Sequence, residues 1–192
     1  MVTALPRPAA SRSALVALRR EKPRSAVPVP MLVVGNLVTG GAGYIGSHAM
    51  LAFRDAGWSV AVIDNLVTGF RSAVPDDVPF YEGNIDDGAL VARIIETHGI
   101  RAIVHFAGSV VVPESVSDPL KYYLNNTVRT RALLEAAVTA GIPHFLFSST
   151  AATYGIPAAI PVREDSPTVP INPYGMSKLM TEAMLRDTAA AY

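Results

Sequence analysis

The sequence predicts an α/β fold in which helices cover both faces of a parallel β-sheet. Apolar, strand-like segments alternate with segments of helical periodicity, and no hairpin turn joins two strands. Strands that are separated by helices run parallel, because each helix returns the chain to the same edge of the sheet. Half of the 192 residues are hydrophobic, which suffices for one domain with a sizeable core.

The first three elements surround a glycine-rich turn. Residues 31–39 form an apolar, β-branched segment typical of a strand, although Gly35 and Asn36 interrupt it. A helical pattern follows over residues 44–57 and closes at Gly57, a residue type that often ends helices. A second buried strand is expected over residues 58–64.

Two strands and a helix come next. A short strand is expected over residues 79–83 and a buried one over 102–108. Between them, Asp86 is the expected N-cap of a helix that runs to His98.

The last three elements begin with a cap and a proline. Asp118-Pro119 predicts the start of a long helix that ends near Ala140. A fifth strand is expected over residues 144–149. Asn172-Pro173 repeats the cap–proline signal and predicts a final helix towards Tyr192.

The first thirty residues differ in composition from the rest. Residues 1–30 hold five prolines, six basic residues and one acidic residue, whereas residues 31–192 carry a net charge of −5. We expect residues 1–30 to be a disordered or non-native extension ahead of a start at Met31, and residues 31–192 to form the domain. A transit-like peptide is the alternative for the extension.

The composition of the whole chain argues against several functions. Sixteen basic residues balance sixteen acidic ones, so no net charge attracts nucleic acid or a membrane. Cysteine is absent, and the four histidines lack the spacing of metal ligands. We therefore expect a cytoplasmic protein with no metal and with no nucleic-acid or membrane partner.

The segment TGGAGYIG at residues 39–46 predicts a dinucleotide site. Gly40, Gly43 and Gly46 allow a tight turn and bring a pyrophosphate close to the start of the helix. Asp64 ends the second strand, where a carboxylate suits the adenosine ribose of NAD and repels the 2′-phosphate of NADP. A turn-forming role for Asp64 is the alternative. The pattern favours a Rossmann-type doubly wound sheet that binds NAD.

Three residues at the carboxyl edge of this sheet are candidates for catalysis. Tyr174 and Lys178 are four residues apart and share one face of the last helix. Thr150, in SSTAATYG, follows the fifth strand. Because an ammonium lowers the pKa of a nearby phenol, Tyr174 could act as a base while Thr150 hydrogen-bonds the reacting oxygen. A surface pair and a plain strand end are the alternatives.

Four motifs in order resemble the extended short-chain dehydrogenase/reductase family, and most closely its UDP-glucose 4-epimerase branch: TGGAGYIGSH, VHFAG, FSSTAATYG and PYGMSKLMTE. The resemblance implies a catalytic set of Thr150, Tyr174 and Lys178, with Thr150 and Tyr174 also contacting substrate. It implies NAD-dependent epimerisation at C4 of a UDP-hexose (UDP-glucose or UDP-galactose) by hydride transfer to NAD and return to the opposite face.

The resemblance also implies further cofactor contacts, at Tyr44, Ile45, Asn65, Leu66, Thr68, Gly69, Asn84, Ile85, Phe106, Ala107, Gly108, Asn126, Tyr174 and Lys178. Two residues depart from the family pattern. Asn84 stands where many members have aspartate, and Val110 stands where many epimerases have lysine.

Ala151 and Ala152 separate epimerisation from dehydration. The dehydratases that this pattern resembles carry an Asp-Glu pair after the threonine and use it to eliminate water. Alanine side chains exchange no proton, so the sequence favours an epimerase.

Only five strands are expected, whereas a six-stranded doubly wound sheet needs one more after the last helix. We therefore expect the chain to be truncated before the last strands and the C-terminal substrate domain, to bind NAD weakly and to turn over sugar poorly. Other functions remain open: a uronate epimerase or reductase of the same family, or a catalytically silent NAD-binding fragment. Family dimers imply a homodimer through helices 118–140 and 172–192, and an amphipathic core helix is the simpler account.

Overall fold

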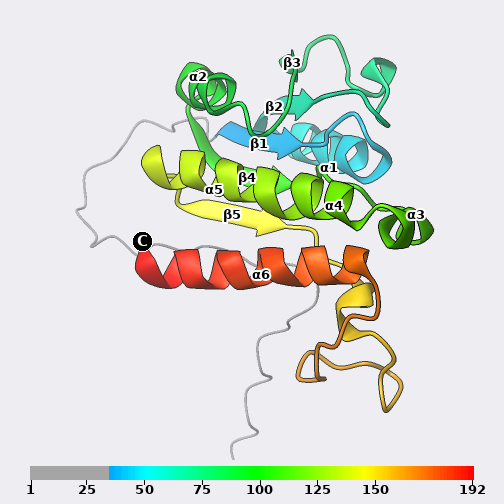
Figure 1. Cartoon of the computed structure of the whole chain (residues 1–192). Coiled ribbons are helices and arrows are strands. Elements are labelled where there is room, and N and C mark those ends of the chain that lie inside the picture. Colours follow the sequence, from blue (N-terminus) through cyan, green and yellow to red (C-terminus); the bar gives the residue numbers. More distant parts are fainter. Residues whose placement is uncertain (1–34) are drawn as a thin grey trace, which may run out of the picture.

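The computed structural model describes residues 35–192, which form a five-stranded sheet with helices on both faces (Figure 1). The strand order is β3-β2-β1-β4-β5, and all neighbouring strands are parallel. This order confirms the predicted Rossmann-type sheet. The predicted extension over residues 1–30 and the first part of the expected strand, residues 31–34, lie outside the described residues.

The five strands lie close to the predicted segments: β1 (Gly35–Thr39), β2 (Ser59–Asp64), β3 (Phe80–Glu82), β4 (Ile100–His105) and β5 (His144–Phe147). Gly35 and Asn36 belong to β1, but the register of its pairing with β4 shifts between them, where the sequence predicts an interruption. The last residues of three strands are in register, since Thr39 pairs with His105 and His105 pairs with Phe147. The segments that follow β1, β4 and β5 therefore leave the sheet side by side.

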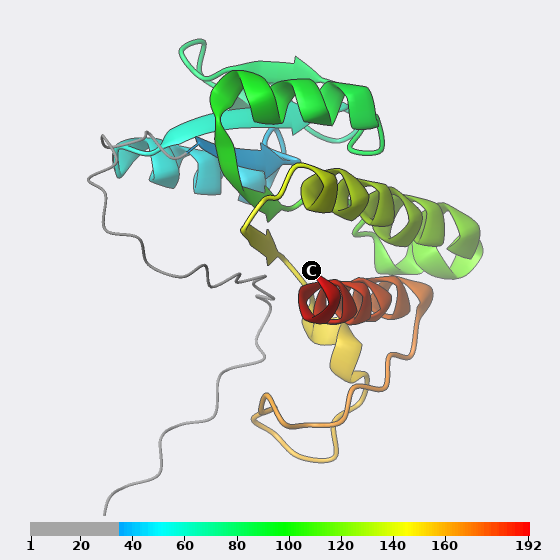
Figure 2. The ribbon, with the colours of Figure 1, turned by 90° about the vertical axis from the view of Figure 1, so that its left-hand side faces the viewer.

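The helices form one layer on each face of the sheet. Helix α1 (Tyr44–Asp55) lies on one face, and α2 (Gly88–His98), α5 (Arg129–Thr139) and α6 (Pro173–Ala191) lie on the other (Figure 2). Two apolar clusters fill the layers, one around Met50 of α1 and one around Ile94, Leu133 and Leu185. Within residues 35–192, no helix combines the length and the apolar character needed to span a membrane.

The predicted helix ends differ from the structure at two points. Asp87 caps α2, because its side chain accepts a hydrogen bond from the Leu90 N–H at 2.9 Å. The predicted cap, Asp86, instead pairs with Arg129 of α5, at 3.4 Å. At the end of α1, Ala56 is the C-cap, and Gly57 follows it with φ +79°. Asp86 and Asp87 are adjacent residues of one type, and the ion pair with Arg129 distinguishes them; at the end of α1 the cap lies one residue before the predicted glycine.

The single helix expected over residues 118–140 is divided. Asp118 caps a short helix α4 (Pro119–Tyr122) as predicted, accepting from the Lys121 N–H at 3.3 Å. A π-helical segment, η2 (Tyr123–Val128), then connects α4 to α5. The wider π-turn leaves the Asn126 carbonyl to a tertiary partner, the Thr181 hydroxyl of α6, at 2.9 Å.

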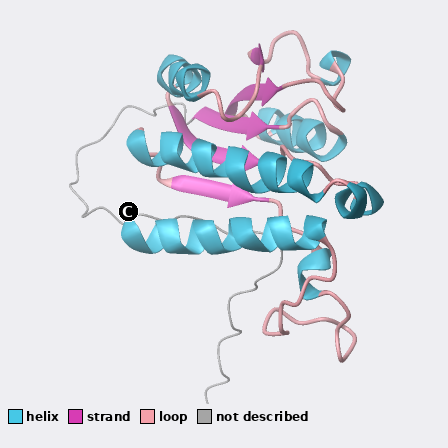
Figure 3. Ribbon diagram, viewed as in Figure 1, coloured by secondary structure: helices cyan, strands magenta, loops and turns pink. Residues whose placement is uncertain are grey.

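Three short helices were not predicted: α3 (Val112–Ser117), η1 (Arg71–Ala73) and η3 (Ala151–Tyr154). They occupy segments between the main elements (Figure 3). None has a helical hydrophobic period long enough to be recognised in the sequence.

Asn172 caps α6 as predicted, and its replacement by alanine should destabilise the fold. The Asn172 side-chain oxygen accepts from the Gly175 N–H at 2.8 Å. Asn172→Ala should lower the free energy of unfolding by about 1 kcal/mol, measured by urea denaturation. Asn172→Ser, which retains a capping oxygen, is the matched control. Equal stability of the alanine and serine variants would show that the cap contributes nothing.

Candidate functional site

A buried hydrogen-bonded chain joins the ends of two strands to α5. The Thr39 hydroxyl lies 2.7 Å from Nδ1 of His105, and Nε2 of His105 lies 2.8 Å from the Thr130 hydroxyl. The Ala107 N–H donates to Thr39 at 3.3 Å. Burial, and then the charge of Lys178, lower the pKa of His105 to about 3. His105 is therefore a neutral core histidine that holds the strand ends together.

The glycine turn presses against the segment that leaves β4. Gly40 has φ +68°, and a Cβ built there would lie 2.6 Å from the Ala107 nitrogen. A Cβ at Gly46 would collide with the Gly40 carbonyl oxygen. The Gly43 N–H donates to that same carbonyl at 3.1 Å and opens α1. Only glycine fits these two crowded positions, and the tight turn that they form leads directly into the start of α1, where backbone N–H groups can bind a phosphate.

Tyr44 and Ile45, the predicted contacts at the start of α1, have exposed side chains. They lie directly after Gly43, at the helix start that the glycine turn opens. Their exposure leaves both side chains accessible to a ligand.

Asp64 connects the end of β2 to the glycine turn. One carboxylate oxygen accepts from the Ala42 N–H at 3.0 Å and the other from the Leu66 N–H at 2.8 Å. The turn-forming alternative for Asp64 is thus present in the structure. A carboxylate oxygen can accept two hydrogen bonds, so each Asp64 oxygen retains capacity for a ribose hydroxyl.

The structure brings together several other predicted cofactor residues around Asp64. The Asn65 side-chain amide donates to the Asn84 side-chain oxygen at 2.8 Å. Gly69 lies against Ala42 of the glycine turn, and Thr68 is exposed. The side chain of Ile85 is buried in the core on the α2 side, so only its backbone faces the loop.

Lys178, Gly108 and Asn126 converge at the carboxyl end of β5. Lys178 is 4% exposed, and its ammonium donates to the Ser148 carbonyl at 3.1 Å. Burial lowers the pKa of Lys178 to about 8. A Cβ at Gly108 would lie 2.8 Å from Oδ1 of Asn126 and 3.6 Å from the Lys178 nitrogen. The bare Gly108 backbone therefore leaves room beside the ammonium.

Asn126 fixes the loop after β4 to α6. Its amide group donates to the Ser109 carbonyl and to the Ser177 hydroxyl, both at 3.0 Å. Its oxygen accepts from the Ser109 N–H at 2.7 Å. The predicted neighbours Phe106 and Ala107 precede this loop and pack against opposite apolar clusters.

Tyr174 stands at the start of α6 against a buried phenol. Its ring meets Tyr122 edge to face, with centroids 6.3 Å apart. The Tyr122 hydroxyl donates to the Val111 carbonyl at 2.6 Å and lies 2.8 Å from Glu114. Burial, foremost, and Glu114 raise the pKa of Tyr122 to about 12, so Tyr122 stays neutral beside Tyr174.

Thr150 is the N-cap of η3, which lies against the first turn of α6. The Thr150 hydroxyl accepts from the Ala152 N–H at 3.2 Å. A Cβ at Gly175 would lie 2.5 Å from the Ala152 carbonyl oxygen, so these two backbones are in close contact. In residues 35–192 no hydrogen bond joins the hydroxyls of Thr150 and Tyr174.

The sequence did not predict two side-chain contacts that connect α6 to the residues at the end of β5. The Ser149 hydroxyl donates to Glu182 of α6, next to Thr150. The ring of Phe147 lies under the Lys178 ammonium, 4.7 Å from centroid to nitrogen. The spacing of Glu182, four residues after Lys178, was the only sequence signal for the first contact.

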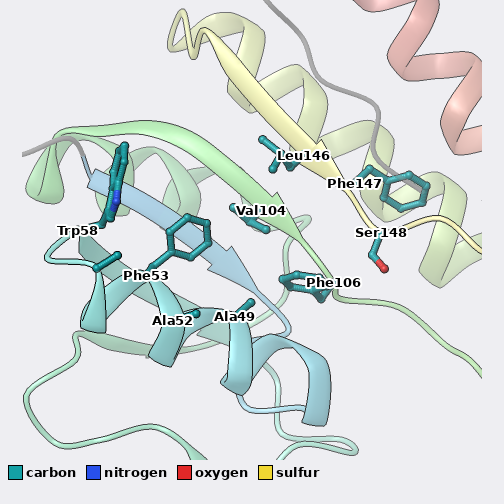
Figure 4. Close-up of a pocket in the computed structure, with 10 residues that line it drawn as sticks. Ala49, Ala52, Phe53, Trp58, Val104, Phe106, Leu146, Phe147 and Ser148 are labelled. Atoms are coloured by element: carbon teal, nitrogen blue, oxygen red, sulfur yellow. The ribbon is translucent and has the colours of Figure 1, made fainter. Parts of the chain in front are cut away.

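An apolar hollow of about 530 Å³ lies on the α1 side of the sheet (Figure 4). Its walls include Phe53, Trp58, Phe106 and Leu146, and it reaches Ser148 at the end of β5. Thr150, Tyr174 and the glycine turn do not line it. The candidate catalytic residues do not line the hollow, but two residues that do, Phe147 and Ser148, contact Lys178.

The glycine turn beside Asp64, at the carboxyl edge of a parallel sheet, defines a dinucleotide-binding domain of the Rossmann type. Residues 36–192 match the NAD dependent epimerase/dehydratase family. The chain belongs to this family, and the predicted family resemblance is confirmed.

Similar proteins are UDP-glucose 4-epimerases. The enzyme of Azospirillum brasilense is 58% identical over 156 residues, which cover 81% of this chain and 45% of that protein. The structure of the Brucella ovis enzyme with NAD has a TM-score of 0.81 at 45% identity, over 83% of this chain and 49% of that one. The Bifidobacterium longum enzyme with NAD+ and UDP has a TM-score of 0.78 at 36% identity, over 82% and 50%. The chain spans about half the length of these relatives.

Burial of Lys178 should destabilise the fold in a pH-dependent way. A lysine in the unfolded chain has the ordinary pKa of 10.5, whereas the pKa of Lys178 in the folded protein is about 8. Below pH 8 the lysine is protonated in both the folded and the unfolded state, and its burial lowers the free energy of unfolding by about 3 kcal/mol. Between pH 8 and 10.5 only the unfolded state keeps the proton, so this cost disappears as the pH rises.

We therefore expect Lys178→Met to raise the free energy of unfolding at pH 7, by up to about 3 kcal/mol. Urea denaturation at about pH 7 and about pH 10 should show this advantage shrinking at the higher pH. Lys121→Met, which removes an exposed ammonium, is the control and should show no such trend. A stability difference that is the same at both pH values would contradict the expectation.

Proposed function

We propose that this chain is the NAD-binding and catalytic part of a UDP-glucose 4-epimerase, with Thr150, Tyr174 and Lys178 as its catalytic residues. The observation that supports this most is the burial of the Lys178 ammonium. It lies one helical turn from Tyr174, at the sheet edge that also carries the glycine turn. The relatives named above, at up to 58% identity, support the same function.

The residues around the glycine turn fit NAD. A Cβ at Gly40 or Gly46 would collide with neighbouring backbone, so only glycine allows this tight turn, and the start of α1 offers backbone N–H groups to a pyrophosphate. Asp64 would accept the ribose hydroxyls, while Asn65 and Asn84 lie next to it. When bound, NAD supplies a reversible hydride acceptor for carbon 4 of the sugar.

In this proposal Tyr174 removes the proton from the 4-hydroxyl group of the sugar. A free phenol has a pKa of about 10, so about one part in a thousand is ionised at neutral pH. Lowering the pKa of a phenol by ~3 units takes ~4 kcal/mol of preferential stabilisation of the phenolate. Because the pKa of Lys178 is about 8, its side chain is mostly an ammonium at neutral pH and stabilises negative charge nearby.

Thr150 would hydrogen-bond the reacting oxygen and orient it towards Tyr174. Ala151 and Ala152 follow Thr150 in η3 and hold no proton that could be exchanged. Their place beside the site favours epimerisation over dehydration. Since relatives are about twice as long, we propose that this chain alone turns over UDP-hexose poorly or not at all. We also propose that it acts in the cytoplasm.

A chimera tests this function. Residues 36–192 would replace the matching N-terminal part of the Azospirillum brasilense enzyme, and interconversion of UDP-galactose and UDP-glucose would be measured. We expect an active chimera, and Tyr174→Phe should reduce turnover on the order of 10²-fold or more while NAD stays bound. Tyr81→Phe is the control, because it removes a tyrosine hydroxyl of β3 that is hydrogen-bonded to His98 of α2. Unchanged turnover with Tyr174→Phe would refute the role of Tyr174.

We also propose that two chains form a homodimer through the helices over residues 118–140 and 172–192. Exposed apolar side chains follow a four-residue spacing on the first helix, at Leu120, Leu124 and Val128. Met176 and Met180 add exposed apolar groups on the neighbouring α6. Exposed apolar side chains on two neighbouring helices are typical of an interface between subunits.

Sedimentation velocity tests the dimer. We expect a mass of twice the 20.3 kDa of one chain, reduced to that of one chain by Leu124→Glu. Ile156→Glu changes an exposed loop residue away from both helices and should leave the dimer intact. A wild-type protein that sediments as a single chain at micromolar concentration would rule out this interface.

A further inference from the structure

The Lys178 ammonium is buried against the face of an aromatic ring. The side chain is 4% exposed, and its nitrogen lies 4.7 Å from the centroid of the Phe147 ring. The carbonyl of Ser148, the next residue along, accepts a hydrogen bond from the same ammonium at 3.1 Å. Phe147 and Ser148 are adjacent at the end of β5 (Figure 4). Two consecutive residues thus contact the ammonium, one by a ring face and one by a carbonyl.

The Phe147 ring is held in place by the His105 imidazole. The two rings are stacked, with centroids 5.6 Å apart and planes inclined by 26°. The imidazole is itself fixed on both sides, by the hydroxyls of Thr39 and Thr130. Phe147 is 1% exposed, so its ring has little freedom to turn away. The orientation of the ring towards Lys178 is therefore set by the core.

We propose that Phe147 is a positioning residue whose ring face holds the Lys178 ammonium at the carboxyl edge of the sheet and favours its charged form. The ring acts through the negative potential of its π face, which attracts a cation most strongly where water is excluded. The relevance to catalysis rests on the proposed function, in which Lys178 stabilises a phenolate. The contact itself exists independently of that function.

The other titratable groups around Lys178 do not replace the ring. His105 of β4 is neutral, because burial lowers its pKa to about 3. On α6 itself, Tyr174 and Glu182 lie one turn to either side, and Glu182 accepts a hydrogen bond from Ser149. On the α3–α4 side, Tyr122 stands behind Tyr174 and is bonded to Glu114. The Phe147 ring is the group whose face lies directly against the ammonium.

Phe147 acts on Lys178 in two opposing ways, which the test must separate. As an apolar wall it excludes water and lowers the pKa of the lysine. As a π face it stabilises the ammonium and raises that pKa. A truncation such as Phe147→Leu changes both effects. Fluorination reverses the polarity of the ring face and keeps nearly the same shape, so it acts chiefly on the second effect, while the control at Phe145 accounts for an altered contact with His105.

The experiment measures the pKa of Lys178 in the whole chain with pentafluorophenylalanine at position 147. Brief acetylation with acetic anhydride, repeated from about pH 6 to about pH 11 and followed by peptide mass spectrometry, reports the reactive free amine. The chain has three lysines, Lys22, Lys121 and Lys178, so each one is resolved. We expect the pKa of Lys178 to fall by about one unit, and that of Lys121 to stay unchanged.

Phe145 provides the matched control. It lies on the same strand, is fully buried, and meets His105 edge to face at 5.9 Å, but the Lys178 ammonium lies over Phe147. Pentafluorophenylalanine at position 145 should leave the pKa of Lys178 unchanged. An unchanged or raised pKa with the substitution at 147, or equal falls at both positions, would overturn the proposal. A single fluorine at the para position of Phe147 should give a smaller fall, and it serves if the fully fluorinated protein does not fold.

The measurement needs neither NAD nor sugar. A fall in the pKa of Lys178 supports the role of Phe147 even if the Tyr174→Phe chimera retains its turnover. Conversely, if the Tyr174→Phe chimera is inactive but the pKa of Lys178 does not change on fluorination of Phe147, the proposed function stands and the role of Phe147 is refuted. The two hypotheses therefore fail in different experiments.

Discussion

The withdrawal of the Lys178 ammonium from water is the constraint around which the carboxyl edge of the sheet is organised. A charged group in such a place needs compensation, and the Ser148 carbonyl and the Phe147 ring provide it. Burial still lowers the pKa of the lysine to about 8, so the compensation is partial. The side chain keeps its charge at neutral pH, and neighbouring groups can readily shift its pKa.

A neutral histidine beneath this charge follows from the same constraint. His105 is enclosed by two threonine hydroxyls, which can donate to or accept from an uncharged imidazole. A carboxylate partner would instead favour imidazolium, and a second buried cation next to Lys178 would be costly. The threonines also join β1, β4 and α5, so the group that keeps the region neutral also aligns the strand ends from which the site residues emerge.

The position of α6 depends on polar contacts with the π-helical segment. Asn126 bonds to Ser109 and Ser177, and its carbonyl accepts from Thr181. Asn126, Ser177 and Thr181 are buried, and an unpaired partner would be costly, so α6 has one favourable register against η2. This register sets where Tyr174 and Lys178 lie relative to Gly108. The irregular turn in the middle of an otherwise regular helix is thus a means of aligning two halves of the site.

The succession of strands and helices, the parallel sheet, the glycine turn with Asp64, and the Tyr174–Lys178 pair on one helix face could all be predicted from the sequence. These features depend on local periodicity, on caps such as Asn172, and on glycines at positions where the backbone turns too tightly for other residues. Three features could not be predicted: Asp87 and not Asp86 caps α2, the helix after Asp118 contains a π-turn, and Phe147 lies under Lys178. In each case the deciding partner is distant in the chain: Arg129 for Asp86, Thr181 for Asn126, and α6 for Phe147. Local patterns hold no information about such partners, because the free energy that selects them arises only when the elements pack together.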